Sequence, residues 1–352
     1  MIIIYILIFF TIFAAITIVL CLINNKLINI KPNNNILEKF SRGFPPIKKY
    51  RFQFFYRAVT PLRPLKSPLK IFDPLDLPEI FIYKPQYFTP VKDQGRCGGC
   101  WAFVICELLS DDVTIKIIKF GKNLNVQQLL SCYPGDGCDG AAPEDALLWM
   151  QEDNFKLEIN NEYLQIRSEC VITKTGFEIE KGSIKSLCKD IKRECIANPT
   201  EEEKNLLKEN INRMKTQLYK DGPFFGSISV YQDFYNFPGN RAYTKGSDQF
   251  IGGHAIEIIG WCDPGVDIRE GFKDGYWVCK NSWSKEWASK YDFPGYFAIK
   301  MGVNECGIES RSGTANTNVE QIWDGSHIPD KLSFSTYKEL LKHVLKSKNE
   351  KL

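Results

Sequence analysis

Residues 94–103 limit what this chain can fold into more than any other stretch. After Cys100 the chain is apolar on nearly every face up to Leu109, a pattern typical of a helix buried on all sides. The two preceding glycines predict a flexible turn whose backbone N–H groups can point at a ligand. The start of a helix favours the thiolate of a cysteine. Cys100 is therefore a candidate nucleophile, and the amide of Gln94 is a candidate donor to an oxyanion.

Histidine is scarce, with three in 352 residues, so the choice of a general base is narrow. His254 is the only histidine before residue 327, and it starts an apolar run that predicts a strand. Asn281 follows a second predicted strand, and its amide oxygen can orient an imidazole and fix its tautomer. An amide suffices, because a thiolate already compensates the charge of an imidazolium. Trp283 can shield this hydrogen bond from water.

The whole chain has a globular composition, with 44% hydrophobic and 25% charged residues. The net charge of +3 indicates no nucleic-acid role, and the scarcity of histidine indicates no metal site or cofactor. The globular region covers residues 77–314. A helix is predicted at 201–220, and β-branched and aromatic runs follow at 226–230, 254–261, 276–280 and 295–301. Helices before strands predict an α+β protein with two subdomains.

The two terminal regions differ from this core. Residues 1–23 carry no charge and predict either a signal-anchor that spans a membrane or a cleaved signal peptide. Residues 24–76 are basic and proline-rich, which favours extended chain. They are either a spacer or a propeptide of a zymogen, with its extended part in the active-site cleft. Residues 315–352 form a tail that ends in a short amphipathic helix.

Two signals on localisation conflict. Positive charges after residue 23 favour a cytoplasmic main domain, whereas the 12 cysteines favour the oxidising side of a membrane. We give the cysteines more weight, since long domains cross membranes largely regardless of flanking charge. The prediction is a membrane-anchored protein or one in a secretory or lysosome-like compartment, with the catalytic domain on the oxidising side.

With Gln94, Cys100, His254 and Asn281 in this order, the chain resembles the papain-like cysteine peptidases, over roughly residues 77–311. Within that family it looks most similar to cathepsin B. The stretches that carry this second likeness are residues 135–140, 221–223, 229–234, 252–253 and 306–310. The resemblance implies a papain-like fold, with a helical domain, a β-barrel-like domain and the active-site cleft between them.

The resemblance also implies roles for single residues. Cys100 would attack the peptide carbonyl to give an acyl-enzyme thioester, and His254 would protonate the leaving amine and then activate water. Asn281 would orient His254, while Gln94 and the backbone N–H of Cys100 would bind the oxyanion. Cys97 would form a disulfide with Cys138. The positions implied for binding a peptide or protein substrate are Gly140, Ala141, Gly253, Trp283 and Arg311.

Several positions depart from the family pattern. Ala141, Ser284 and Ala288 stand where glycine is usual, and the methyl group of Ala141 is expected to crowd the cleft. No histidine lies between positions 138 and 221, where cathepsin B carries the His pair of its carboxydipeptidase activity, so an endopeptidase is predicted. Arg311 would lie at the floor of a specificity pocket and favour Asp or Glu; alternatively it turns to solvent or pairs with Glu309.

Two other functions remain open. The fold can serve as a catalytically inactive binding module, or Cys97-x-x-Cys100 can act in a thiol-disulfide oxidoreductase. The second alternative gives His254 and Asn281 no role. Further disulfides are expected among four cysteines whose pairing the sequence does not fix: Cys132, Cys170, Cys188 and Cys195. Three others are expected to stay unpaired: Cys262, Cys279 and Cys306.

Overall fold

The computed structural model describes residues 60–73, 75–117, 122–135, 137–160, 162–318 and 333–349. The predicted membrane segment at 1–23 and most of the basic region lie outside these residues. No helix in the described part of the chain has the length and apolar character needed to cross a membrane. The 3-10 turns are η1 (Pro85–Tyr87), η2 (Gly137–Asp139), η3 (Gln232–Phe234) and η4 (Glu305–Gly307).

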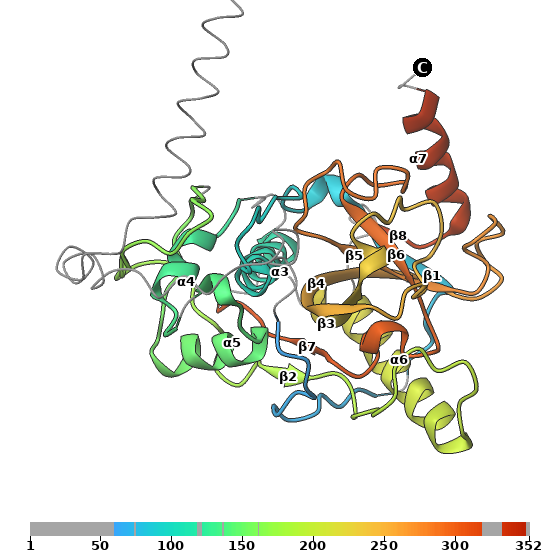
Figure 1. Cartoon of the computed structure of the whole chain (residues 1–352), viewed down its shortest axis with the longest axis horizontal. Coiled ribbons are helices and arrows are strands. Elements are labelled where there is room, and N and C mark those ends of the chain that lie inside the picture. The colour runs from blue at the N-terminus through green and yellow to red at the C-terminus, as the bar shows by residue number, and fades with distance from the viewer. Residues whose placement is uncertain are drawn as a thin grey trace, which may run out of the picture. The chain divides into compact units, whose positions relative to one another are not determined.

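The helical part is built around α3 (Cys100–Ile117), which begins at the cysteine that the sequence singled out (Figure 1). Its side chains are buried along nearly the whole length. The helix continues past the end of the apolar run, because its polar residues find partners inside the protein. Ser110 Oγ donates to the Cys106 carbonyl at 2.5 Å, and Asp111 accepts the Thr89 N–H at 2.8 Å.

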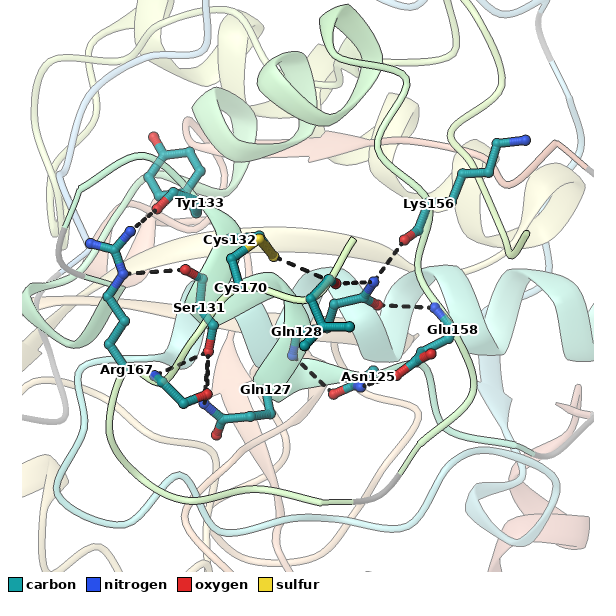
Figure 2. Close-up of a disulfide and its surroundings, with 12 residues drawn as sticks. Asn125, Gln127, Gln128, Ser131, Cys132, Tyr133, Lys156, Glu158, Arg167 and Cys170 are labelled. Atoms are coloured by element: carbon teal, nitrogen blue, oxygen red, sulfur yellow. Dashed lines mark hydrogen bonds between the residues drawn. A yellow bond between two sulfur atoms is a disulfide. The ribbon is translucent and has the colours of Figure 1, made fainter. Parts of the chain in front are cut away.

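Two shorter helices, α4 (Val126–Cys132) and α5 (Pro143–Glu152), pack beside α3 and precede a long irregular loop. Amide side chains of α4 bind the backbone of this loop (Figure 2). Gln128 Nε2 donates to the carbonyls of Lys156 and Val171, and Gln127 Nε2 donates to that of Ile166. The Cys132–Cys170 disulfide fixes the far end of the loop to the same helix.

The second part of the chain forms an antiparallel sheet. Its main strands are β3 (Phe224–Tyr231), β4 (Phe250–Cys262), β5 (Tyr276–Lys280) and β6 (Tyr296–Lys300), close to the four predicted runs. The shorter strands are β1 (Ile80–Tyr83), β2 (Lys185–Ser186), β7 (Ser312–Thr314) and β8 (Ser333–Phe334). The strand order is β2-β7-β3-β4-β1-β8, with β5 and β6 branching from β4. Among the described strands this sheet stays open and does not close into a barrel.

Two predicted helices of this part are confirmed. α6 (Glu201–Asp221) begins at a capping box in which Thr200 and Glu203 satisfy each other's backbone N–H groups. The tail forms α7 (Tyr337–Asn349), whose residues Leu340 and Val344 are buried against the sheet. The mixed architecture confirms the predicted α+β class.

One buried lysine joins the helical part to the sheet. Lys280, at the end of β5, has a fully buried side chain whose Nζ donates to Thr89 Oγ1 at 2.6 Å. It lies 3.2 Å from Asp111 Oδ2 on α3 and 3.4 Å from Glu257 Oε2 on β4. The neighbouring acidic groups raise the pKa of Lys280 above its usual value despite burial, so it stays charged. This ion cluster positions β5, and the residue directly after it is Asn281.

Candidate active site

The predicted nucleophile lies at the first turn of α3. Cys100 is fully buried. The backbone N–H groups of Ala102 and Phe103 donate to the carbonyl of Gly99, so this carbonyl accepts the first hydrogen bonds of the helix. Cys97, three residues earlier, forms the predicted disulfide with Cys138. Because Cys97 is held in this bond, no bond joins the two cysteines of the Cys-x-x-Cys pattern in this structure.

The predicted base lies on β4 opposite Ile228 of β3. His254 Nε2 is 2.8 Å from Asn281 Oδ1, and the ring centroid of Trp283 lies 4.7 Å from that of His254. An amide oxygen only accepts, so Nε2 carries a hydrogen and Nδ1 becomes the other, proton-accepting atom of a neutral ring. Trp283 is 2% exposed and covers the pair as expected. Asn281 Oδ1 also accepts the Ser282 N–H at 2.8 Å, which fixes the amide orientation.

Gln94 is tied to the same loop as Asn281. Its Oε1 accepts Ser282 Oγ at 2.7 Å and Trp283 Nε1 at 3.1 Å, and its Nε2 donates to the Cys97 carbonyl at 3.0 Å. The side-chain amide is therefore oriented with its nitrogen toward the turn that precedes Cys100. Tyr163, from the long loop, donates to the Gln94 carbonyl at 2.9 Å. Tyr163 could not be predicted from the sequence, because nothing near it in the chain resembles a motif.

A residue outside the predicted site connects its two sides. Thr60 Oγ1 is 3.1 Å from Cys100 Sγ, and the Thr60 N–H donates to the Gly253 carbonyl at 2.8 Å. One residue thus contacts the thiol and the residue before His254. A Cβ on Gly253 would lie 1.8 Å from the Thr60 carbonyl oxygen and 2.9 Å from Leu62 Cδ2. Only glycine at this position allows the two backbones to approach so closely.

The chain after Thr60 continues across the helical part. Arg63 pairs with Glu144 at 3.1 Å and with Asp145, both in the first turn of α5. The buried carboxylate of Glu144 also accepts the backbone N–H groups of Lys66 and Ser67, at 3.0 and 2.7 Å. These charge-assisted bonds hold an extended segment in one position.

The segment then reaches the edge of the sheet. Ser186 of β2 donates its backbone N–H to Pro68 and accepts that of Lys70. Lys70 Nζ pairs with Asp221 at 3.0 Å and donates to Gln217 at 2.8 Å. Residues 60–70 are therefore anchored at the thiol, at α5 and at β2. The partners Glu144 and Asp221 of this basic region become visible only in the fold.

Arg311 neither turns to solvent nor pairs with Glu309. It is 8% exposed, so it does not turn to solvent, and its Nη1 lies 3.0 Å from Glu194 Oε1. Its Nη2 donates to Ser229 Oγ at 3.1 Å. Glu309 is buried elsewhere and accepts Trp277 Nε1 and two backbone N–H groups. Arg311 lines a cavity of about 470 Å³ together with Glu194, Leu62 and others, but its charge is compensated.

Two more of the predicted substrate positions, Gly140 and Ala141, lie next to each other before α5. Gly140 has a φ of +94°, a left-handed conformation that favours glycine. Ala141 is 6% exposed and packs into the apolar cluster around α3, so its methyl group is accommodated there. Ser284 and Ala288 keep positive φ angles of +69° and +50°, which fits positions where glycine is usual.

The other cysteines follow the prediction only in part. Cys132 pairs with Cys170 as one of the open possibilities allowed. Cys188 and Cys195 are free thiols in this structure, which contradicts the expectation that both join disulfides. Cys262, Cys279 and Cys306 are free, as predicted.

Comparisons with known proteins agree with this geometry. Residues 77–315 match the family described as papain family cysteine protease. Cathepsin B-like cysteine proteinase 6 of Caenorhabditis elegans is 30% identical over 263 residues, covering 67% of this chain and 65% of that protein. The gut-specific cysteine proteinase of the same organism is 29% identical over 240 residues, covering 62% of this chain and 66% of that protein. The chain spans just under two thirds of the length of these relatives.

Two solved structures share the fold. Procathepsin B S9 from Trypanosoma congolense aligns with a TM-score of 0.58 and 21% identity, over 76% of this chain and 88% of that one. Bromelain from Ananas comosus, in complex with the inhibitor E64, aligns with a TM-score of 0.50 and 20% identity, over 67% and 98%. Both confirm the predicted papain-like fold. Since the family match covers more than half of its length, the chain belongs to the papain family of cysteine proteases.

Proposed function

We propose that the chain is a cysteine endopeptidase that acts through Cys100, His254 and Asn281 and an acyl-enzyme thioester. The observation that carries this proposal is the hydrogen bond of His254 to Asn281 under Trp283, beside a helix that begins at Cys100. The inactive binding module is the alternative. A binding module would have no use for an imidazole that is held in one orientation by an amide, and both the sequence pattern and the geometry support such a pair.

The proposed reaction uses these atoms in order. His254 Nδ1 takes the Cys100 proton, and the helix start stabilises the resulting thiolate. The thiolate attacks the peptide carbonyl, and the oxyanion accepts bonds from Gln94 Nε2 and the Cys100 backbone N–H. The imidazolium then protonates the leaving amine, which leaves a thioester. A water molecule, deprotonated by His254, hydrolyses the thioester and restores Cys100. Asn281 keeps the ring oriented through both transfers.

Endopeptidase specificity is testable with paired peptides. Residues 138–221 contain no histidine, so this part of the chain offers no imidazolium that could bind a substrate's C-terminal carboxylate. We expect a peptide with a free C-terminus and its amidated form to be cleaved internally, at rates that differ by less than about threefold. If the enzyme bound the C-terminal carboxylate, amidation would remove a charge-assisted bond and lower the rate about tenfold or more. Mass spectrometry of the products gives the answer. Stepwise release of C-terminal dipeptides would contradict the proposal.

We also propose that residues 60–76 inhibit the site in the uncleaved chain. Thr60 contacts Cys100 Sγ and the Gly253 carbonyl, and Arg63 anchors the segment to Glu144 and Asp145. A substrate cannot reach the thiol while Thr60 lies on it. This supports the propeptide alternative over the spacer.

The inhibitory segment predicts a difference between the uncleaved and the cleaved protein. The full chain is expected to be latent, and protein cleaved before residue 77 is expected to be active. A peptide of residues 60–76 should inhibit the cleaved protein. About tenfold more of its Arg63→Ala variant should be needed, since a hydrogen bond between charged groups contributes about 1.5–3 kcal/mol. Lys66→Ala is the matched control, because Lys66 is exposed and its side chain only adds charge. Equal effects of the two variants would contradict the anchoring.

Arg311 gives a prediction about specificity. Glu194 compensates the charge of Arg311. We therefore expect only a weak preference for substrates that place Glu rather than Leu in the cavity. Glu194→Gln should release the guanidinium and raise the Glu-to-Leu ratio of kcat/KM about tenfold, the value of one charge-assisted pair. Asp190→Asn is the control, since Asp190 lines the same cavity but is exposed. Profiling a peptide library decides this; an unchanged ratio in Glu194→Gln would overturn it.

For localisation, we propose a secretory or lysosome-like compartment. The disulfides Cys97–Cys138 and Cys132–Cys170 support the oxidising side of a membrane. The anchor predicted at 1–23 stays a prediction.

A further inference from the structure

Two free cysteines lie next to each other, Cys195 directly after Glu194 and Cys306 five residues before Arg311. The sulfur atoms of Cys195 and Cys306 and a carboxylate oxygen of Glu305 all lie within 4.8 Å of one another. Cys195 Sγ donates to Glu305 Oε1 at 3.3 Å and accepts the Cys306 N–H at 3.4 Å. Neither thiol has a role in the proposed hydrolysis.

The backbone holds the two thiols together. The N–H groups of Cys195 and Ile196 donate to the carbonyls of Asn304 and Val303, at 3.0 and 2.7 Å, so the two segments run side by side. Cys195 and Cys306 both have a φ of +50°, a left-handed conformation that few residues other than glycine adopt. Such backbone persists only where its surroundings over-determine it, and it clusters at functional positions.

The pair connects the two walls of the cavity. Glu194, directly before Cys195, is the partner of Arg311, and Arg311 Nη2 donates to the Cys306 carbonyl at 2.5 Å. A bond between the two sulfur atoms would therefore fix Glu194 and Arg311 relative to each other. It would also close a loop of about a hundred residues, where the chain-entropy gain of a disulfide is large.

We propose that Cys195 and Cys306 form a redox-active pair that closes to a third disulfide and fixes the wall of the cavity. The proposal does not depend on the chemistry of Cys100. The oxidant is a small-molecule disulfide such as oxidised glutathione. The half-buried Cys195 attacks one of its sulfur atoms as thiolate and releases one thiol. Cys306 then attacks Cys195 Sγ, its proton passes to the leaving sulfur, and the second thiol is released. Two electrons pass from the protein to the oxidant, and the two protein protons end on the released thiols.

A metal site is the competing use of this cluster. Glu305 Oε1 already accepts the Lys245 N–H at 2.7 Å, so its lone pairs are shared. A structural zinc site normally has four protein ligands, and within the described residues this cluster offers three. Disulfide formation needs only the two sulfur atoms, so it is the use that the geometry favours.

The test is differential alkylation of the full chain in glutathione buffers of graded potential. Free thiols are blocked with one reagent after unfolding, disulfides are reduced, and the released thiols receive a second reagent. Peptide mass spectrometry reads each cysteine. We expect Cys195 and Cys306 to change label together as the buffer becomes more oxidising. A digest of unreduced protein should contain the peptide in which the two cysteines are cross-linked. Cys97–Cys138 and Cys132–Cys170 serve as internal disulfide controls.

Variants separate a disulfide from simple packing. Cys195→Ser, Cys306→Ser and the double variant should all lower the oxidised protein's Tm equally, by about 4 °C or more, because each removes the same bond. Cys188→Ser is the control and should leave the Cys195–Cys306 cross-link in place. Three results would overturn the proposal. The first is that both thiols stay free in buffers in which the control disulfides remain oxidised, and the second is a cross-link between Cys188 and Cys195. The third is stoichiometric binding of zinc while both thiols are reduced.

Discussion

Replacing Cys100 by alanine is expected to lower kcat/KM for peptide hydrolysis by at least about 10⁴-fold, because the variant has no nucleophile. His254→Ala should lose a similar factor, and the double variant should be no worse, since the two residues act as one unit. Asn281→Ala should lose less, about 10–10³-fold, because it only orients the ring. Steady-state kinetics on a fluorogenic peptide give all four values.

Cys106 provides the matched control on the same helix. Burial raises the pKa of Cys106 to about 12, so it stays a neutral thiol at working pH and cannot be a nucleophile. Cys106→Ala should keep kcat/KM within about twofold. Full activity in Cys100→Ala, or a loss in Cys106→Ala as large as that in Cys100→Ala, would show that the nucleophile has been misassigned.

Lys280→Met is expected to lower the free energy of unfolding by about 3–5 kcal/mol, the usual effect of removing one partner from a buried ion pair. The variant would leave Asp111 without its cation, beside Glu107 and Glu257 in a fully buried place. Urea unfolding of the full chain carrying Cys100→Ala, which prevents self-cleavage, measures this loss. Because β5 leads into Asn281, the loss of order should also reach the active site.

Two controls test the electrostatic reason. Lys300→Met removes a half-exposed pair with Asp274 and should change stability by about 0–1 kcal/mol. Burial, and then the charge of Asp111, raises the pKa of Glu257 well above its usual value. Replacing this carboxyl by a neutral amide should therefore cost much less stability than Lys280→Met does. A loss in Lys280→Met no larger than that in Lys300→Met would contradict the account.

The sign of the pH dependence follows from the same carboxyl. The pKa of Glu257 is higher in the folded than in the unfolded state. Its contribution to stability is therefore fully present at a pH below its unfolded-state pKa. The contribution is lost as the pH rises through its folded-state pKa. Glu257→Gln should therefore flatten the decline of stability toward high pH.

The sequence predicted the parts whose signal is local. The start of α3 at Cys100 follows from an apolar run after two glycines, and the four main strands follow from β-branched and aromatic runs. The bond between His254 and Asn281 was found because so few histidines compete for the role. In the first two cases the pattern lies within a few residues, whereas His254 and Asn281 are 27 residues apart.

The parts that were missed depend on contacts between distant residues. The polar end of α3 stays helical because Asp111 meets Thr89 and Lys280, which no local pattern reveals. Arg311 was assigned by position alone, and its partner Glu194 lies 117 residues away. Thr60 carries no motif, and its contact with the thiol depends on the path of the whole segment.

The most direct test of the central claim is labelling with a thiol-reactive epoxysuccinyl peptide, applied to the full chain and to protein cleaved before residue 77, with mass spectrometry of the modified residue. The account predicts modification of Cys100 in the cleaved protein, loss of labelling in His254→Ala, and protection in the full chain, where Thr60 covers the sulfur. If Cys100 is reduced but stays unlabelled in the cleaved protein, the chain has no activated thiolate and is not a cysteine peptidase.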